Sequence, residues 1–169
     1  MKKITLLIIA TMVTVSTLSA QNYMVVNSKK IFDSMSEYTQ ALDNIETLAE
    51  GYQANVDKKF DEVEALYNSY MQRQSSLNTT ERKVYEAKIT QLEADAVEYQ
   101  ESIFAANGQL MQKRLEMLSP IQTKAFDTIE SYAKANGFDL VLDEATTSSI
   151  IYRNDYIDRT KEIIMLLKK

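Results

Sequence analysis

The residue types that most often carry out chemistry in proteins are missing from this sequence. The 169-residue chain contains no histidine and no cysteine, which removes the commonest general bases, thiol nucleophiles and zinc ligands. Its three glycines, Gly51, Gly108 and Gly137, form no phosphate-cradling loop. We therefore expect that the protein is not an enzyme and needs no cofactor.

Acidic residues near the end of the chain are the remaining candidates for a metal site. Asp139, Asp143 and Glu144 precede Asp155 and Asp158, and carboxylate oxygens are the ligands that calcium prefers. Their spacing does not match that of a known calcium-binding loop. Helix caps and solvated turns explain these residues more simply, so we predict no metal site.

Tyrosine is the most distinctive residue type that remains. The chain has 10 tyrosines and no tryptophan. One interpretation is structural: rings pack between helices while their hydroxyls reach water. The other is functional, because tyrosine and methionine side chains can form an adaptable surface for apolar or aromatic-rich partners. On that second interpretation the candidate client-binding residues are Tyr67, Tyr70, Met71, Leu77 and Tyr85.

Most of these tyrosines lie in two long stretches of regular apolar spacing. Apolar residues at alternating steps of four and three are typical of a coiled-coil seam. The first stretch contains Ile31, Met35, Tyr38, Leu42, Ile45, Ala49, Tyr52, Val56, Val63, Leu66 and Tyr70, with Lys59 as its polar break. The second contains Tyr85, Ile89, Leu92, Ala96, Tyr99, Ile103, Ala106, Leu110 and Met117.

A polar segment separates the two stretches. Residues 75–80 are rich in Ser, Thr and Asn, which favour local side-chain hydrogen bonds over helix, and Asn78 with Glu81 resembles a capping box. We therefore predict an antiparallel helical hairpin over residues 36–117 with its tip near 75–80. At ~1.5 Å per residue, the first helix of this arm would be ~60 Å long.

A proline lies in the second helix, at the position where we expect the arm to join a compact base. Pro120 either kinks this helix or starts a new one, because proline removes a backbone donor and suits a first turn. Gly137 is placed to end the helix that follows.

Short strands are expected in this base, which we assign to residues 21–35 and 118–169. Residues 21–27 predict one strand, and residues 137–153 predict two more joined by a polar turn. Such strands are marginal alone and their edges need covering, either by the chain's own helices or, as we favour, by other copies of the chain. The predicted oligomerisation residues are Val25, Val26, Leu140, Val141, Leu142, Ile150, Ile151 and Tyr152. Asp158 can cap a final helix.

The N-terminus predicts export. Residues 1–20 combine a basic start, an apolar run and small residues before Ala20, as a cleaved secretory signal peptide does; an uncleaved membrane anchor is the alternative. Without Lys2 and Lys3 the chain has 17 basic and 24 acidic residues, a net charge of −7, which argues against a nucleic-acid partner. Residues 68–88 carry four basic and two acidic side chains, so a weak contact of the tip with membrane surfaces is one interpretation.

This layout resembles the Skp (OmpH-like) family of periplasmic chaperones along essentially the whole mature chain. The specific matches lie at its two ends: Val26, Asn27 and Phe32 near the start, then Asp139–Asp143, Tyr152, Asp158 and Thr160. The resemblance implies an α+β, mostly α fold with a long antiparallel helical hairpin projecting from a small β-sheet body. It also implies a homotrimer in which the strands assemble the body and three arms surround a cavity.

The function that the resemblance implies is that of a periplasmic holdase, which binds unfolded outer-membrane proteins without ATP and prevents their aggregation. The well-known members are strongly basic, whereas this mature chain is acidic. We therefore expect apolar contacts to hold the clients and carry over no lipopolysaccharide site. The alternative function is that of a coiled-coil spacer or tether in the cell envelope that binds no clients.

Overall fold

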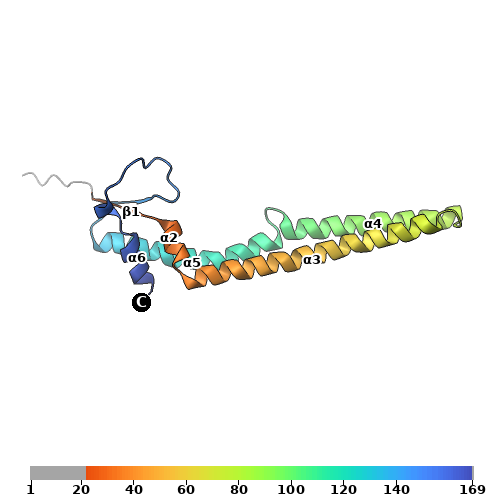
Figure 1. The fold of residues 1–169 in the computed structure, drawn as a ribbon, viewed down its shortest axis with the longest axis horizontal. Helices are drawn as coiled ribbons and strands as arrows, with labels where there is room; N and C mark the ends of the chain where they lie inside the picture. The colour runs from red at the N-terminus through yellow and green to blue at the C-terminus, as the bar shows by residue number, and fades with distance from the viewer. Residues whose placement is uncertain (1–21, 169) are drawn as a thin grey trace, which may run out of the picture. The chain divides into compact units, whose positions relative to one another are not determined.

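The computed structural model describes residues 22–168 and divides them into two compact units (Figure 1). One unit, which we call the body, comprises residues 22–30 and 128–167. The other, the helical unit, comprises Ile31–Asp127. The predicted signal peptide at residues 1–20 lies outside the described residues. Within residues 22–168, no helix combines the length and the hydropathy that a membrane crossing requires.

Two long antiparallel helices dominate the helical unit. α3 (Ser36–Arg73) and α4 (Thr79–Phe104) lie side by side and form the hairpin (Figure 1). Most of the predicted seam is confirmed, since its residues are buried or half-buried along both helices. Leu42 is an exception: 42% of its side chain is exposed, and Ala41 is buried in its place. Within α3 and α4 the buried seam residues are Ile45, Val56, Tyr70, Ala96 and Ile103.

The tip of the hairpin is closed by the predicted capping box. The Asn78 side chain accepts hydrogen bonds from the backbone N–H groups of Thr80 (2.9 Å) and Glu81 (3.0 Å). The Glu81 carboxylate in turn accepts the backbone N–H of Asn78 at 2.8 Å. Three backbone donors at the start of α4 are therefore satisfied, which fixes where this helix begins.

The second half of the arm is two helices, whereas the regular spacing predicted one. α4 ends at Phe104, and α5 (Gln109–Ala135) begins after a turn at residues 105–108. Gly108 approaches the preceding backbone so closely that an added Cβ would lie 2.5 Å from the Ile103 carbonyl oxygen. Ala106, which we placed on the seam, is exposed in this turn. Pro120 lies inside α5 and does not start a new helix.

The first part of α5 replaces α4 as the partner of α3. Ala41 and Ile45 of α3 form an apolar cluster with Leu118 of α5, and Tyr38 and Met117 pack against it. Beside this cluster the Phe32 ring stacks on Tyr38 at 5.1 Å and meets Phe126 edge-on at 5.9 Å. Lys124 and Glu37 join the same two helices through an ion pair of 2.7 Å.

The body contains a two-stranded parallel sheet. β1 (Tyr23–Val26) pairs with β2 (Leu140–Asp143), with Tyr23 opposite Leu140 and Val26 opposite Asp143. The predicted strand pair within residues 137–153 is wrong: β2 pairs with β1, and residues 150–154 have no regular structure. The physical reason is that a strand needs a partner for its backbone, and among the described residues Ile150–Tyr152 have none.

Local capping residues set the ends of the remaining helices. α2 (Ser28–Asp33) begins after Asn27, whose side chain accepts the Lys30 N–H at 2.9 Å. α5 ends as predicted before Gly137, which has a φ of 69° and so suits glycine. The 3₁₀ turn η1 (Asp155–Ile157) leads to Asp158, whose carboxylate accepts the Thr160 N–H at 2.9 Å and caps α6 (Thr160–Leu167).

Candidate functional site: an exposed apolar surface on the hairpin

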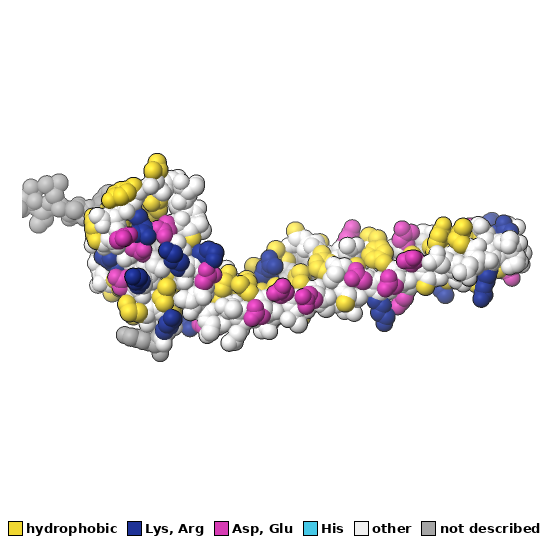
Figure 2. Space-filling view, viewed as in Figure 1, with side chains coloured by type: hydrophobic (Ala, Val, Ile, Leu, Met, Phe, Trp, Pro, Cys, Tyr) yellow, Lys and Arg dark blue, Asp and Glu magenta, His cyan; other side chains and the backbone are white. Residues whose placement is uncertain are grey.

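The hairpin leaves large apolar side chains in solvent along its length. Two helices packed along one narrow seam can bury only one stripe each, so apolar residues outside that stripe stay exposed. Figure 2 shows apolar patches between charged side chains on one face of this region. The exposed large apolar residues of α3 and α4 are Leu42, Tyr67, Met71, Val84, Val97 and Phe104.

Two of the predicted client-binding residues belong to this surface. Tyr67 and Met71 are each 48% exposed. They lie four residues apart on α3, so their side chains occupy neighbouring positions on one face of the helix. An exposed ring beside a flexible thioether is suited to contact apolar groups of varied shape.

The other two predicted tyrosines face each other across the seam. Tyr70 is buried and stacks on the half-buried Tyr85, with ring centroids 5.7 Å apart and planes 23° apart. The Tyr70 hydroxyl donates to the Glu86 carboxylate at 2.6 Å and accepts from the Gln74 side-chain amide at 3.1 Å. Because the Glu86 carboxylate accepts a hydrogen bond from the protonated phenol, it raises the pKa of Tyr70 above its ordinary value of 10.0. In this arrangement both rings join the two helices.

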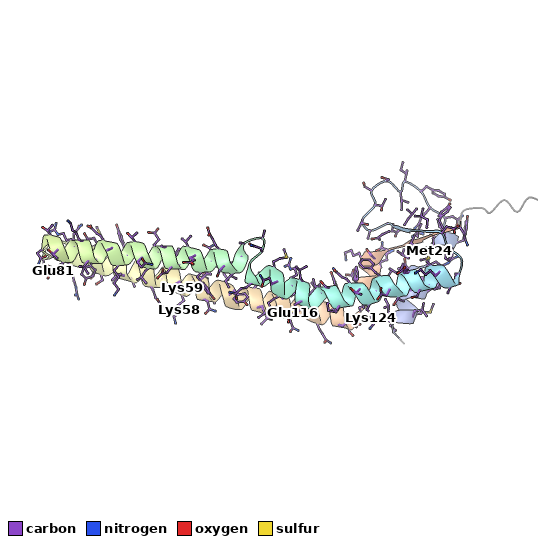
Figure 3. All side chains as sticks on the ribbon, turned by 180° about the vertical axis from the view of Figure 1, so that it is seen from behind. Met24, Lys58, Lys59, Glu81, Glu116 and Lys124 are labelled. Atoms are coloured by element: carbon purple, nitrogen blue, oxygen red, sulfur yellow. The ribbon has the colours of Figure 1, made fainter. Side chains whose placement is uncertain are left out.

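Leu77, the fifth predicted residue, lies in the turn at the tip. It is half-buried, and its carbonyl accepts a hydrogen bond from the Arg82 side chain at 3.1 Å. Figure 3 labels Glu81 at this end of the hairpin. The structure therefore brings Tyr70 and Tyr85 together as a packed pair and leaves Tyr67 and Met71 on the surface.

The polar break in the seam has an aromatic partner. The Lys59 ammonium lies 5.0 Å from the centre of the Tyr99 ring, so a cation–π contact joins α3 to α4. Figure 3 labels Lys59 on the hairpin. Sequence periodicity identified Lys59 as an interruption but gave no sign of this partner. Through this contact the Lys59 side chain is engaged between the two helices.

The body carries a second apolar surface. Of the predicted oligomerisation residues, Val25 and Val26 are buried, whereas Ile151 is 98% and Tyr152 82% exposed. Leu140 is also exposed, and Val141, Leu142 and Ile150 are half-buried. A hollow of about 600 Å³ opens beside β1; its lining includes Tyr23, Val25, Leu142, Ile150, Ile151, Tyr152 and Tyr156.

Charged side chains hold the loop that carries Ile151 and Tyr152. Arg153 forms ion pairs with Glu144 and, at 2.9 Å each, with Asp155 and Asp158. Its hydrogen bond to Glu144, aided by one from Asn27, lowers the pKa of the Glu144 carboxyl. The group is a structural tie, and no cluster of potential metal ligands is found within residues 22–168.

Asp143 connects the end of β2 to the start of α2. Its carboxylate accepts the Ser28 hydroxyl at 2.6 Å and the backbone N–H groups of Ser28 and Ala145, both at 3.0 Å. Burial by itself raises the pKa of Asp143, but these hydrogen bonds outweigh it and the pKa is lowered. The backbone N–H of Asn27 donates to the Thr160 hydroxyl at 2.9 Å. Of the residues singled out at the two ends of the sequence, Asn27, Asp143, Asp158 and Thr160 thus belong to one group of hydrogen bonds and ion pairs.

A family model described as Outer membrane protein (OmpH-like) matches residues 22–167, which is nearly all of the described chain. No curated protein gives a significant sequence match.

Proposed function

The chain belongs to the OmpH-like family, whose members are periplasmic chaperones of outer-membrane proteins and not enzymes, and from that premise we propose that it is an ATP-independent holdase. In this proposal three copies assemble through their bodies, and the hairpins surround a cavity. Unfolded outer-membrane proteins bind in that cavity and are kept from aggregating.

The exposed apolar side chains of the hairpin are the observation that carries the proposal. The neighbouring pair Tyr67 and Met71 lies on α3, and Val97 and Phe104 lie at other positions on α4, so the exposed apolar side chains are distributed along the hairpin. Such sites bind an extended chain weakly at many points, and three hairpins would multiply the effective concentration of each contact. Weak, distributed contact suits a chaperone that must release its client without nucleotide, because each contact can break independently.

The exposed apolar surface of the body supports assembly. Ile151 and Tyr152 are almost fully exposed beside the hollow at β1, and among the described residues β2 pairs only with β1. Large exposed apolar patches are typical of interaction surfaces. An open strand edge is usually paired with another chain or covered by another part of the protein. We propose that other copies of this chain cover this surface, with the segment 150–152 as part of the contact.

The direct test is the aggregation of an outer-membrane β-barrel protein diluted from urea, measured by light scattering with and without the purified mature chain. The chain's mass in solution is recorded alongside. We expect a trimer that suppresses aggregation without ATP, saturating near one trimer per client. A well-folded trimer that leaves aggregation unchanged would contradict the holdase proposal and favour an envelope spacer.

A further inference from the structure

Charge is unevenly distributed along the hairpin. Its middle section, which we define as residues 50–67 of α3 and 89–104 of α4, contains nine acidic and two basic side chains. All nine carboxylates are exposed, and one of the two lysines, Lys59, is committed to the Tyr99 ring. The tip segment, residues 68–88, instead has four basic and two acidic side chains. On the face shown in Figure 2, acidic side chains gather along the hairpin and basic ones at its tip.

The carboxylates and the exposed apolar residues share the same helix faces. Glu93 and Glu101 lie four residues before and after the exposed Val97, and residues at this spacing are neighbours on a helix surface. Glu101 also lies three residues before the exposed Phe104. Glu64 lies three residues before Tyr67 on α3. Each exposed apolar side chain of the middle section therefore has a carboxylate one turn away.

A partner for such a surface must satisfy both features. An apolar side chain that covers Val97 or Tyr67 brings its sequence neighbours close to these carboxylates. A Lys or Arg at that position gains Coulomb attraction, whereas an Asp or Glu is repelled. Resting on the proposed function, we propose that the middle section of the hairpin selects unfolded segments in which Lys or Arg lies next to aromatic or aliphatic residues. The occupant is thus a cationic, apolar stretch of unfolded polypeptide.

The test uses three labelled, unstructured peptides with identical aromatic and aliphatic residues that alternate with Lys, Gln or Glu. Binding to the full mature chain is measured by fluorescence anisotropy at low salt and at about 0.5 M NaCl, where screening is strong. We expect the Lys peptide to bind roughly tenfold more tightly than the Glu peptide at low salt, with the Gln peptide between them. The difference should shrink to about twofold or less at high salt.

Two variants connect the preference to the surface. Glu93→Gln/Glu101→Gln removes the carboxylates on both sides of Val97 and should reduce the advantage of the Lys peptide by several-fold. The matched control Asp127→Asn/Glu130→Gln removes the same charge from exposed positions of α5 and should leave the preference unchanged.

Three results would overturn the inference: equal affinities for the three peptides, tightest binding of the Glu peptide, or no peptide binding by a chain that suppresses client aggregation. In each of these cases the proposed holdase function stands. If the chain also fails to suppress aggregation of the unfolded β-barrel protein, the proposed function fails and the inference fails with it.

Discussion

The ring of Tyr70 stacks on the ring of Tyr85, with centroids 5.7 Å apart, and so connects the end of α3 to the start of α4. The hydrogen bond from the Tyr70 hydroxyl to Glu86 adds a second connection between the same two helices. Together they join the helices next to the turn, where a long hairpin has few other buried residues. This pair keeps the two helices in register near the tip. Tyr67 and Met71, which are close to Tyr70 on α3, are exposed.

The stack predicts a graded response to substitution of Tyr70. Tyr70→Phe keeps the ring and loses the hydroxyl's hydrogen bonds with Glu86 and Gln74. The Glu86 carboxylate is exposed and can be solvated, so a small effect is expected. Tyr70→Ala also removes the ring and should lower the thermal midpoint of the hairpin by about 5 °C or more. Circular dichroism on both variants checks this order. Equal midpoints for the two variants would show that the ring contributes nothing to the packing.

Alanine should have opposite effects on stability at two glycines, Gly108 in the turn between α4 and α5 and Gly51 within α3. Gly108→Ala places a Cβ 2.5 Å from the Ile103 carbonyl oxygen, so the backbone must shift at an estimated cost of about 1–3 kcal/mol. Gly51→Ala lies within α3 and meets nothing within 4 Å, so it should stabilise the helix by up to about 1 kcal/mol. Urea unfolding of the two variants measures both changes. A neutral Gly108→Ala would mean that the turn can straighten without cost.

Acid should destabilise the body. The pKa values of Asp143, Glu144 and Asp158 are lowered in the folded chain, below ordinary values of 3.8 for Asp and 4.5 for Glu. Their ionised forms therefore stabilise the fold, fully so above those ordinary values, and this contribution is lost as the pH falls through the lowered pKa values. Urea midpoints between pH 7 and pH 3 should fall most steeply below about pH 4.5.

Asp143→Asn supplies the control for this pH dependence. The variant should be less stable than the parent chain at pH 7, because an amide replaces a carboxylate that accepts hydrogen bonds from Ser28, Ala145 and Thr146. It should also lose less stability on acidification, since one titrating group is gone. Identical pH profiles for the two chains would show that Asp143 does not contribute.

Assembly through the body predicts that charge on its exposed apolar loop splits the oligomer. Ile151→Asp/Tyr152→Asp places two carboxylates on the surface that we propose other copies cover, so the mass in solution should fall toward that of one chain. Val84→Asp is the control, because Val84 is also a large apolar residue with most of its side chain exposed (62%) but lies on the hairpin. Light scattering after gel filtration gives the masses. An unchanged oligomer in the double variant would exclude this loop from the contact.

The periodic features of the fold could be predicted from the sequence. The apolar steps of four and three give the hairpin seam because each helix buries one stripe, and local signals such as Asn78, Gly137 and Asp158 act over a few residues. The break at residues 105–108 was missed because Ala106 and Leu110 kept the spacing intact. A heptad count considers only the apolar positions, so it does not detect the turn signal Asn107–Gly108 that lies between them.

Long-range pairing and surface exposure could not be predicted in the same way. The apolar run Ile150–Tyr152 has the composition of a strand, yet whether it forms one depends on a partner that lies far away or in another chain. Similarly, tyrosines on and beside the seam look alike in sequence. Tyr70 is buried and Tyr67 is exposed because of where the second helix passes, which spacing alone does not give.

Client aggregation by a hairpin-surface variant tests the central claim most directly. Tyr67→Ser/Met71→Ser/Val97→Ser replaces three exposed apolar side chains and leaves the buried seam and the body intact. Suppression of the aggregation of an unfolded β-barrel protein is compared with that of the parent chain at equal oligomer concentration. We predict an unchanged helical content and mass, with at least a several-fold higher concentration needed for the same suppression. A folded variant that suppresses aggregation as well as the parent chain would contradict the assignment of client binding to this surface.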